Sequence, residues 1–162
     1  MQIRAATSDD AAAIAALWNP IIRDTTVTFT TQEHTSDSLA ARIAAKSASG
    51  EPFCVAHSGD EIFGFATYGP FRSGPGYRHA IEHTIILAPA ARGQGLGRAL
   101  LGTLETAARA QGKHAMIAGV SGDNPDAIAF HEACGFAEVG RLPQIGWKFG
   151  RWLDLVLLHK LL

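Results

Sequence analysis

The chain has 162 residues, 47% hydrophobic and 18% charged, with a net charge of −1 at pH 7, which fits one domain spanning residues 1–162. The near-zero charge argues against a nucleic-acid partner, because a sequence-independent nucleic-acid surface needs an excess of Lys and Arg. No apolar run has membrane-spanning length and the polar start is unlike a signal peptide, so we expect a cytoplasmic protein with no membrane partner.

Helices and strands alternate along the predicted secondary structure. In chain order we expect a strand at 3–5, a helix from 8 through 18, a β-prone stretch at 27–30, a helix at 36–47, strands at 53–57 and 62–68, a Gly/Pro-rich loop at 69–76, a strand at 80–87, a glycine-rich turn at 92–97, a helix at 99–111, a strand at 115–120, a short helix at 125–134, and strands at 136–140 and 152–159. This order predicts a mixed α/β fold.

The longest predicted helix follows the glycine-rich turn, residues 91–98 (ARGQGLGR). Such a turn leaves backbone N–H groups free at a helix N-terminus, where an anion is favoured, and Arg92 and Arg98 add positive charge. A Walker A loop would need Gly-Lys-Ser/Thr, and a dinucleotide fingerprint would need G-x-G-x-x-G; neither is present. The alternative is a plain flexible connection. The turn resembles the R/Q-x-x-G-x-G/A signature of the GNAT acetyltransferase superfamily.

That resemblance implies that the turn holds the pyrophosphate of acetyl-CoA. The cofactor-binding residues it implies are Arg92, Gly93, Gln94, Gly95, Leu96, Gly97 and Arg98, the backbone of Ile85, Ile86 and Leu87 near the thioester, and Asn124 on the coenzyme arm. It also implies a twisted, mostly antiparallel sheet with one splayed parallel pair, flanked by about four helices.

Residues 79–83 (HAIEH) match the H-x-x-E-H zinc-protease pattern, which requires a helix. The β-branched run that follows predicts a strand instead, in which His79 and His83 would lie roughly 13 Å apart. One zinc ion binds nitrogen at about 2 Å, so we expect no metal here. Strand alternation groups Glu82 with Thr84 and Ile86, and a carboxylate in an apolar strand is costly without a role or a partner. Glu82 is therefore a candidate general base, and a salt-bridged strand residue is the alternative.

Residues 124–136 (NPDAIAFHEACGF) predict a short helix capped by Asn124. The segment resembles the GNAT N-x-x-A…G-F stretch, in which a tyrosine seven residues after the Asn often protonates the departing thiolate. His131 stands at that position here, as in the phosphinothricin and methionine-sulfoximine acetyltransferase branch. A histidine can relay protons at neutral pH, so His131 is a candidate thiolate acid or second base; a surface histidine is the alternative.

The resemblance to this branch extends over most of the chain, at residues 25–29 (TTVTF), 77–84 (YRHAIEHT) and 143–154 (PQIGWKFGRWLD). It is weakest at 38–49, where the aromatic residues common in relatives are missing, and Phe71 replaces the usual Trp. The branch implies a homodimer and direct transfer of an acetyl group to a small amine that carries a carboxylate. The substrate-binding residues we expect are Arg72, Arg78, Tyr77, Phe29 and Thr84.

Three functions remain open at this point. The first is acetylation of a small amino-acid-like amine, with Glu82 as base. The second is acetylation of a protein N-terminus or lysine, and the third is a non-catalytic CoA-binding sensor. Cys54 and Cys134, without a C-x-x-C spacing, are expected to be small buried residues, with a catalytic thiol or a disulfide as the alternatives.

Overall fold

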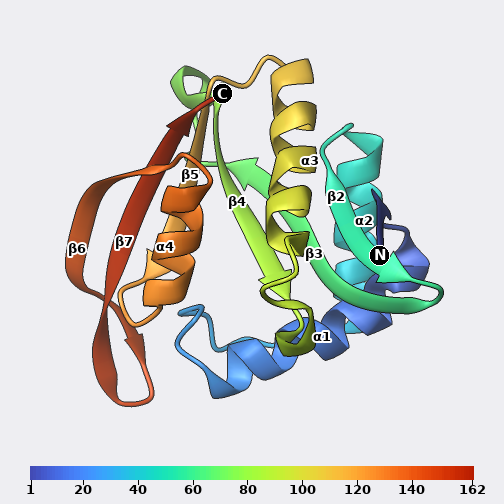
Figure 1. Ribbon diagram of the computed structural model, residues 1–162, viewed down its shortest axis with the longest axis horizontal. Coiled ribbons are helices and arrows are strands. Elements are labelled where there is room, and N and C mark those ends of the chain that lie inside the picture. The colour runs from blue at the N-terminus through green and yellow to red at the C-terminus, as the bar shows by residue number, and fades with distance from the viewer.

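A computed structural model describes residues 1–162, and its helices cover a single mixed sheet (Figure 1). The elements are β1 (Gln2–Ala5), a 3-10 turn (Ser8–Asp10), α1 (Ala11–Asp24), α2 (Ser36–Ala48), β2 (Phe53–Ser58), β3 (Glu61–Pro70), a 3-10 turn (Pro75–Tyr77), β4 (Ala80–Leu87), a 3-10 turn (Pro89–Ala91), α3 (Leu96–Ala110), β5 (Ala115–Ser121), α4 (Pro125–Ala133), β6 (Ala137–Lys148) and β7 (Arg151–Leu161). The strand order is β1-β2-β3-β4-β5-β7-β6, and only β4 and β5 pair in parallel. The predicted mixed α/β fold is confirmed.

Three predicted segments differ from the structure. Helix α1 continues past Trp18 through Pro20, and the burial of Ile21 and Ile22 offsets the backbone hydrogen bond that the proline removes. The β-prone stretch 27–30 forms no strand, since no neighbouring strand pairs with it; the Lys148 ammonium donates to its backbone at the Thr28 oxygen, 2.7 Å away. Strand β6 does not end at Gly140 but runs on to Lys148.

The extension of β6 passes through Pro143, which lacks a backbone N–H. Two features of the strand accommodate it. The strand lies at the edge of the sheet, where a proline is tolerated, and its pairing with β7 is interrupted between Leu142 and Gly146.

The core is divided into two apolar clusters by the sheet. Helix α3 packs on one face with residues such as Leu100 and Ile81, and α1 and α2 pack on the other with residues such as Ile22 and Ile86. Because side chains alternate along a strand, Glu82 and Thr84 share the face of Ile86, as predicted. Helix α4 lies on the same side of the sheet as α3 (Figure 1).

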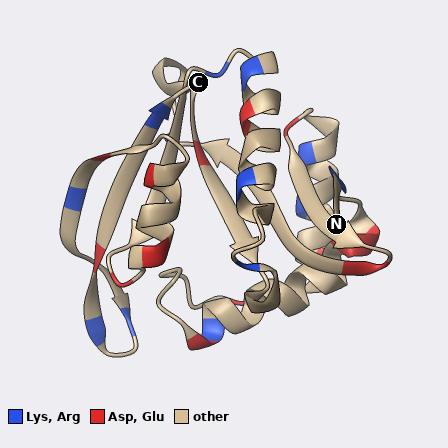
Figure 2. Cartoon of the chain, in the orientation of Figure 1, with Lys and Arg blue, Asp and Glu red and all other residues tan.

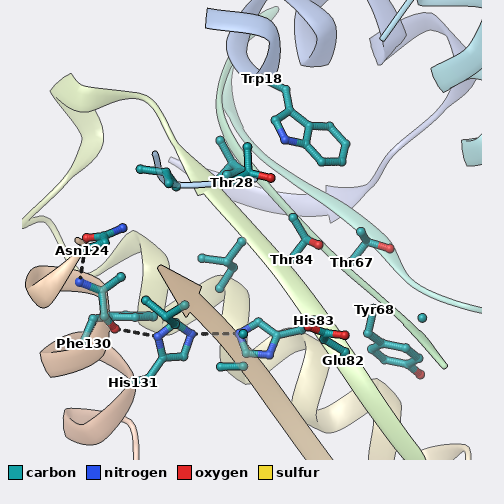
Figure 3. Close-up of a pocket in the computed structure, with 18 of the residues that line it drawn as sticks. Trp18, Thr28, Thr67, Tyr68, Glu82, His83, Thr84, Asn124, Phe130 and His131 are labelled. Carbon is teal, nitrogen blue, oxygen red and sulfur yellow. Dashed lines mark hydrogen bonds between the residues drawn. The ribbon is translucent and has the colours of Figure 1, made fainter. Parts of the chain in front are cut away.

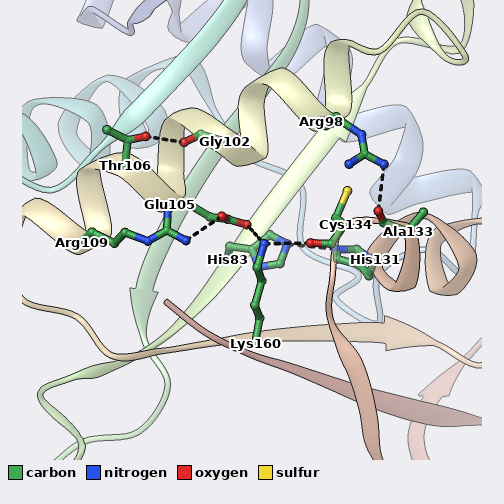
Figure 4. A network of polar contacts seen from close by, with 10 residues as sticks. All are labelled: His83, Arg98, Gly102, Glu105, Thr106, Arg109, His131, Ala133, Cys134 and Lys160. Carbon is green, nitrogen blue, oxygen red and sulfur yellow. Dashed lines mark hydrogen bonds and ion pairs between the residues drawn. The ribbon is translucent and has the colours of Figure 1, made fainter.

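Polar contacts tie α3 to the C-terminal part of the chain (Figure 4). Glu105 of α3 is buried and accepts a hydrogen bond of 2.6 Å from the Lys160 ammonium of β7. The same ammonium donates to the backbone oxygen of Cys134 at the end of α4, 2.8 Å away. Arg98, in the first turn of α3, donates to the Ala133 oxygen at 2.9 Å. The N-terminus of α3 is thereby held against the end of α4.

Both cysteines are free and buried, as predicted, and burial raises the pKa of each thiol. Positive and negative side chains are interspersed along the chain (Figure 2). None of the helices has the length and apolarity needed to cross a membrane.

Candidate active site

Strands β4 and β5 pair over a short distance and then diverge. Only Ala80, Ile81 and Glu82 of β4 pair with β5, whereas β5 stays paired with β7 along its whole length. The edge of β4 that faces β5 is therefore unpaired from His83 onward. This gap is the predicted splay between the two parallel strands.

Backbone donors of β4 point into the gap at alternate residues. The Ala88 N–H donates to Phe63 and the Phe71 N–H donates to Ala80, so the even-numbered residues of β4 bond toward β3. The N–H groups of the odd-numbered Ile85 and Leu87 consequently face the gap. Ile86, which was predicted to contribute with them, uses its backbone toward β3 instead.

A cavity of about 450 Å³ lies beside this gap, and Glu82 lines it. Solvent reaches the carboxylate, yet the surrounding protein displaces enough water for burial to raise the pKa of Glu82. Gly119 of β5 makes room for it, because a Cβ at that position would lie 2.7 Å from the Glu82 Oε1 atom. Figure 3 shows Trp18 at the opposite end of the cavity from Glu82.

Two histidines meet on the α4 side of the same cavity (Figure 3). The Nε2 atoms of His83 and His131 are 3.0 Å apart. The Nδ1 atom of His83 lies 3.0 Å from the Ile117 oxygen, and that of His131 lies 2.6 Å from the Ala127 oxygen. Burial lowers the pKa of both rings, that of His83 to about 3. His83 and His79, the pair considered for zinc, have separate partners, since His79 contacts the Gly112 oxygen.

A second cavity, of about 540 Å³, lies at the N-terminus of α3. Gly93 and Gly95 line it with φ of 73° and 78°, values that favour glycine, and nothing lies within 4 Å of a Cβ added at either. Arg92 and Arg98 line it as well. Open backbone, a helix N-terminus and two guanidinium groups suit a pyrophosphate, so these residues fit the phosphate end of acetyl-CoA.

Three other residues of the turn have different surroundings. Gln94 donates to the Ala90 oxygen, and Leu96 is buried in the core. Gly97 lines the second cavity, but a Cβ there would lie 3.2 Å from the Phe130 ring, so this glycine also permits close packing of α3 against α4.

The two cavities are adjacent and share lining residues. Asn124 is one of them, and its Oδ1 atom caps α4 by accepting from the Ala127 N–H at 3.1 Å, which leaves its Nδ2 atom as a donor. The shared lining residues are Val27, Ile85, Ile86, Asn124, Ala127 and Phe130. A ligand of the second cavity can therefore meet a ligand of the first beside Ile85.

Only one of the predicted substrate-binding residues, Thr84, lines the first cavity. Arg72 is exposed over the Phe71 ring, and Arg78 donates to His79. Tyr77 is 46% exposed. Neither arginine nor the tyrosine lines either of the two cavities, so their substrate contacts stay predictions.

Phe29 packs against β6 rather than into the cavity. A Cβ at Gly146 would lie 2.4 Å from its ring, and the neighbouring Val27 and Thr28 line the cavity instead. Trp18 and Arg42, which line the cavity from α1 and α2, were not among the predicted site residues. Trp18 was expected only as the last residue of the first helix, and nothing in the local sequence separated Arg42 from a solvated charge.

The chain is similar to proteins of one family. The model of the "Acetyltransferase (GNAT) family" matches residues 18–136. The L-amino acid N-acyltransferase MnaT of Escherichia coli is 38% identical over 98% of this chain and 92% of its own length. The L-methionine sulfoximine/L-methionine sulfone acetyltransferase of Salmonella typhimurium is 37% identical over 98% of this chain and 93% of its own length. A phosphinothricin acetyltransferase of Sinorhizobium meliloti, solved in complex with acetyl-CoA, superposes with a TM-score of 0.93 at 32% identity, covering 99% of this chain and 88% of that one.

Proposed function

The chain belongs to the acetyltransferase (GNAT) family and is an N-acetyltransferase, and from this premise we propose that it acetylates the amino group of a small amino acid. One observation carries the proposal: Glu82 lines the first cavity, Leu87 lines the second, and Ile85, whose N–H group is free like that of Leu87, lines both. The names of the relatives support the substrate class, since they act on L-amino acids, methionine sulfoximine or sulfone, and phosphinothricin.

We assign the second cavity to acetyl-CoA. Gly93 and Gly95 offer backbone N–H groups to the pyrophosphate, Arg92 and Arg98 offer charge, and the Asn124 amide offers a donor to the arm. When bound, acetyl-CoA supplies a thioester whose carbonyl carbon accepts the lone pair of the amine. The N–H groups of Ile85 and Leu87 are placed to polarise that carbonyl.

We assign the base to Glu82. An amino group is mostly protonated at pH 7, so a proton must leave before nitrogen can attack. The raised pKa of Glu82 improves it as an acceptor. Glu82 takes one proton from the ammonium group, directly or through water, and so frees the lone pair for attack. A second proton leaves the nitrogen as the N–C bond forms and the C–S bond breaks. The departing thiolate requires a proton, and His131, which lines the same cavity, is the proposed donor or a second base.

A turnover assay with purified protein tests this function. Acetyl-CoA is mixed with phosphinothricin, methionine sulfone, methionine sulfoximine, common amino acids, and peptides with a free N-terminus or lysine; free thiol and product mass are followed. Acetylation of the small amino acids is the expected result. Turnover of peptides alone would establish the protein N-terminal or lysine acetyltransferase instead. Binding of acetyl-CoA without turnover of any amine would establish the sensor.

We also propose a homodimer, formed through the edge of the sheet. Large apolar side chains are exposed there on and between β6 and β7, and Trp147 and Trp152 contact each other with ring centroids 4.7 Å apart. The exposed residues are Val139, Leu142, Ile145, Trp147, Phe149 and Trp152, each 41–59% exposed. Apolar surface gathered at a strand edge is typical of an association site.

A further inference from the structure

Arg42 of α2 is the one Lys or Arg that lines the cavity of Glu82. Its guanidinium group makes no ion pair and no hydrogen bond within the chain, in contrast to most other arginines. Arg92, which faces the phosphate cavity, also lacks an acceptor, and there the expected ligand is an anion. The same reasoning points to an anionic ligand in front of Arg42.

Arg42 is exposed to solvent on one side, and its other surroundings partly desolvate the guanidinium group. The guanidinium carbon lies 5.5 Å from the centre of the Trp18 ring, and burial lowers the pKa of the arginine. The same positive charge contributes to lowering the pKa of His34. The aromatic face stabilises a partly desolvated cation, but no protein group accepts a hydrogen bond from its N–H groups. A ligand that brings oxygens to this position would supply them.

The geometry of α2 places Arg42 across the cavity from Glu82. Lys46, one helical turn further along, donates to the backbone oxygen of Tyr68 on β3. The residue after Tyr68 is Gly69, which pairs directly with Glu82. Residues four apart lie on one helix face, separated by about 6 Å of rise. Arg42 and Glu82 therefore line one cavity from the α2 and β4 sides.

We propose that Arg42 binds a two-oxygen anionic group of the substrate while Glu82 receives the proton of its amine. This inference rests on the proposed function and narrows it to amino acids whose carboxylate, or side-chain phosphinate, reaches Arg42. A guanidinium group binds either anion with two parallel hydrogen bonds. The neutral Thr67 and Thr84 side chains that also line the cavity offer no competing charge.

The test compares Arg42→Gln and Arg42→Lys with the wild-type chain, and Arg23→Gln, at an exposed arginine of α1 that lines neither cavity, is the matched control. KM and kcat are measured for phosphinothricin, methionine sulfone and the amide of methionine sulfone. A lost charge-assisted contact raises KM about 10- to 100-fold for Arg42→Gln, with partial recovery in Arg42→Lys. KM for acetyl-CoA stays unchanged in both. The control substitution leaves the KM values for the three amines and for acetyl-CoA at those of the wild type.

The three amines distinguish the two anions. If Arg42 binds the carboxylate, both acids lose affinity in Arg42→Gln and the amide, already a weak substrate, does not. If it binds the phosphinate, only phosphinothricin loses affinity. Equal KM values for wild type and Arg42→Gln with all three amines would overturn the proposal, while turnover by the wild type would leave the proposed function standing.

Calorimetric binding of phosphinothricin and methionine sulfone to the protein saturated with CoA gives a readout that does not depend on turnover. Binding that weakens in Arg42→Gln supports the anion site even if no amine is acetylated, and in that case only the proposed function fails. Absence of binding to the wild type, or equal binding to wild type and Arg42→Gln, would overturn the anion site.

Discussion

The Nε2 atoms of His83 and His131 lie 3.0 Å apart, and the Nδ1 atom of each ring faces a backbone carbonyl. A carbonyl oxygen only accepts, so each Nδ1 atom must carry a proton, and a bond between the Nε2 atoms needs a third proton. A third proton would give the pair a positive charge. Burial disfavours this charge and so lowers the pKa of both rings. A neutral pair therefore holds two protons for three contacts, and a proton accepted during turnover would be shared between the two Nε2 atoms.

The lowered pKa values of this pair predict acid sensitivity. Below a pH of about 6.5 the unfolded chain protonates both histidines, whereas the folded chain keeps them neutral to a lower pH, which is about 3 for His83. The unfolded state then binds more protons, so the free energy of unfolding falls as the pH is lowered from about 6.5 toward 3. Each fully neutral histidine contributes a slope of about 1.4 kcal/mol per pH unit. Urea unfolding at pH 7.5 and pH 5 measures this loss.

His83→Asn should reduce that pH slope, because the side chain no longer titrates. His34 also has a pKa lowered by burial, so the quantity to compare is the difference between wild type and variant rather than either slope. Identical slopes in the two proteins would contradict the neutral state of His83.

Glu82→Gln should lower kcat at least about 100-fold, since it removes the proton acceptor while preserving shape. Acetyl-CoA affinity, measured by calorimetry, should not change, because Glu82 lies outside the phosphate cavity. The wild-type rate should also fall on acidification at a pH above the ordinary range for glutamate, in line with the raised pKa. The control Glu61→Gln alters an exposed residue on β3. A kcat for Glu82→Gln within a few fold of wild type would remove Glu82 as the base.

Gly119→Ala should impair turnover without unfolding the chain. The new methyl group would approach the Glu82 Oε1 atom to 2.7 Å, and the carboxylate, being the end of a flexible side chain, would shift. Displacement of a reacting group by about 1 Å costs up to about 100-fold in rate. Steady-state kinetics and a thermal melt measure both effects. Gly102→Ala, in the middle of α3 with open space around it, is the control and should raise stability by about 0.5–1 kcal/mol. Equal kcat values for the two variants would rule out this packing role.

Trp147→Lys should shift the chain toward the monomer if the exposed apolar edge of β6 forms the dimer. A lysine in place of an indole leaves a charge without a partner in the interface, which disfavours association. Light scattering coupled to gel filtration gives the mass directly. Arg141→Glu, a charge change on the same strand, reports whether charge alone has this effect. A wild-type chain that elutes as a monomer would contradict the dimer itself.

Local sequence patterns were sufficient to predict which residues share a face of β4. They were also sufficient to predict the open backbone of the glycine-rich turn. Strand alternation predicts that Glu82 and Ile86 share a face, and the spacing of Gly93 and Gly95 before a helix predicts open backbone. Both properties depend on residues adjacent in sequence. The β-prone stretch 27–30 shows the limit, because a strand needs a neighbour to pair with, and no strand pairs with this stretch.

The substrate end of the site could not be predicted in the same way. The cavity is assembled from α1, α2, β3, β4, β5 and α4, and its lining depends on contacts distant in sequence. A lone arginine on a helix is usually solvated, so Arg42 carried no signal until Trp18 and Glu82 were placed around it. Arg72 and Arg78 were favoured for their position before Glu82, yet the loop that carries them leaves their side chains outside both cavities.

The adjoining cavities have a consequence for inhibition. Because Val27, Ile85 and Asn124 line both, a single molecule can occupy the whole site without crossing a wall of protein. Coenzyme A joined through its sulfur and a two-carbon linker to the nitrogen of an amino acid would be such a bisubstrate compound. Because its two halves are covalently joined, binding of the second half costs no further loss of translational and rotational entropy. Such a compound should bind far more tightly than either half alone, and a crystal grown with it would display Arg42, Glu82 and Arg92 around one continuous ligand.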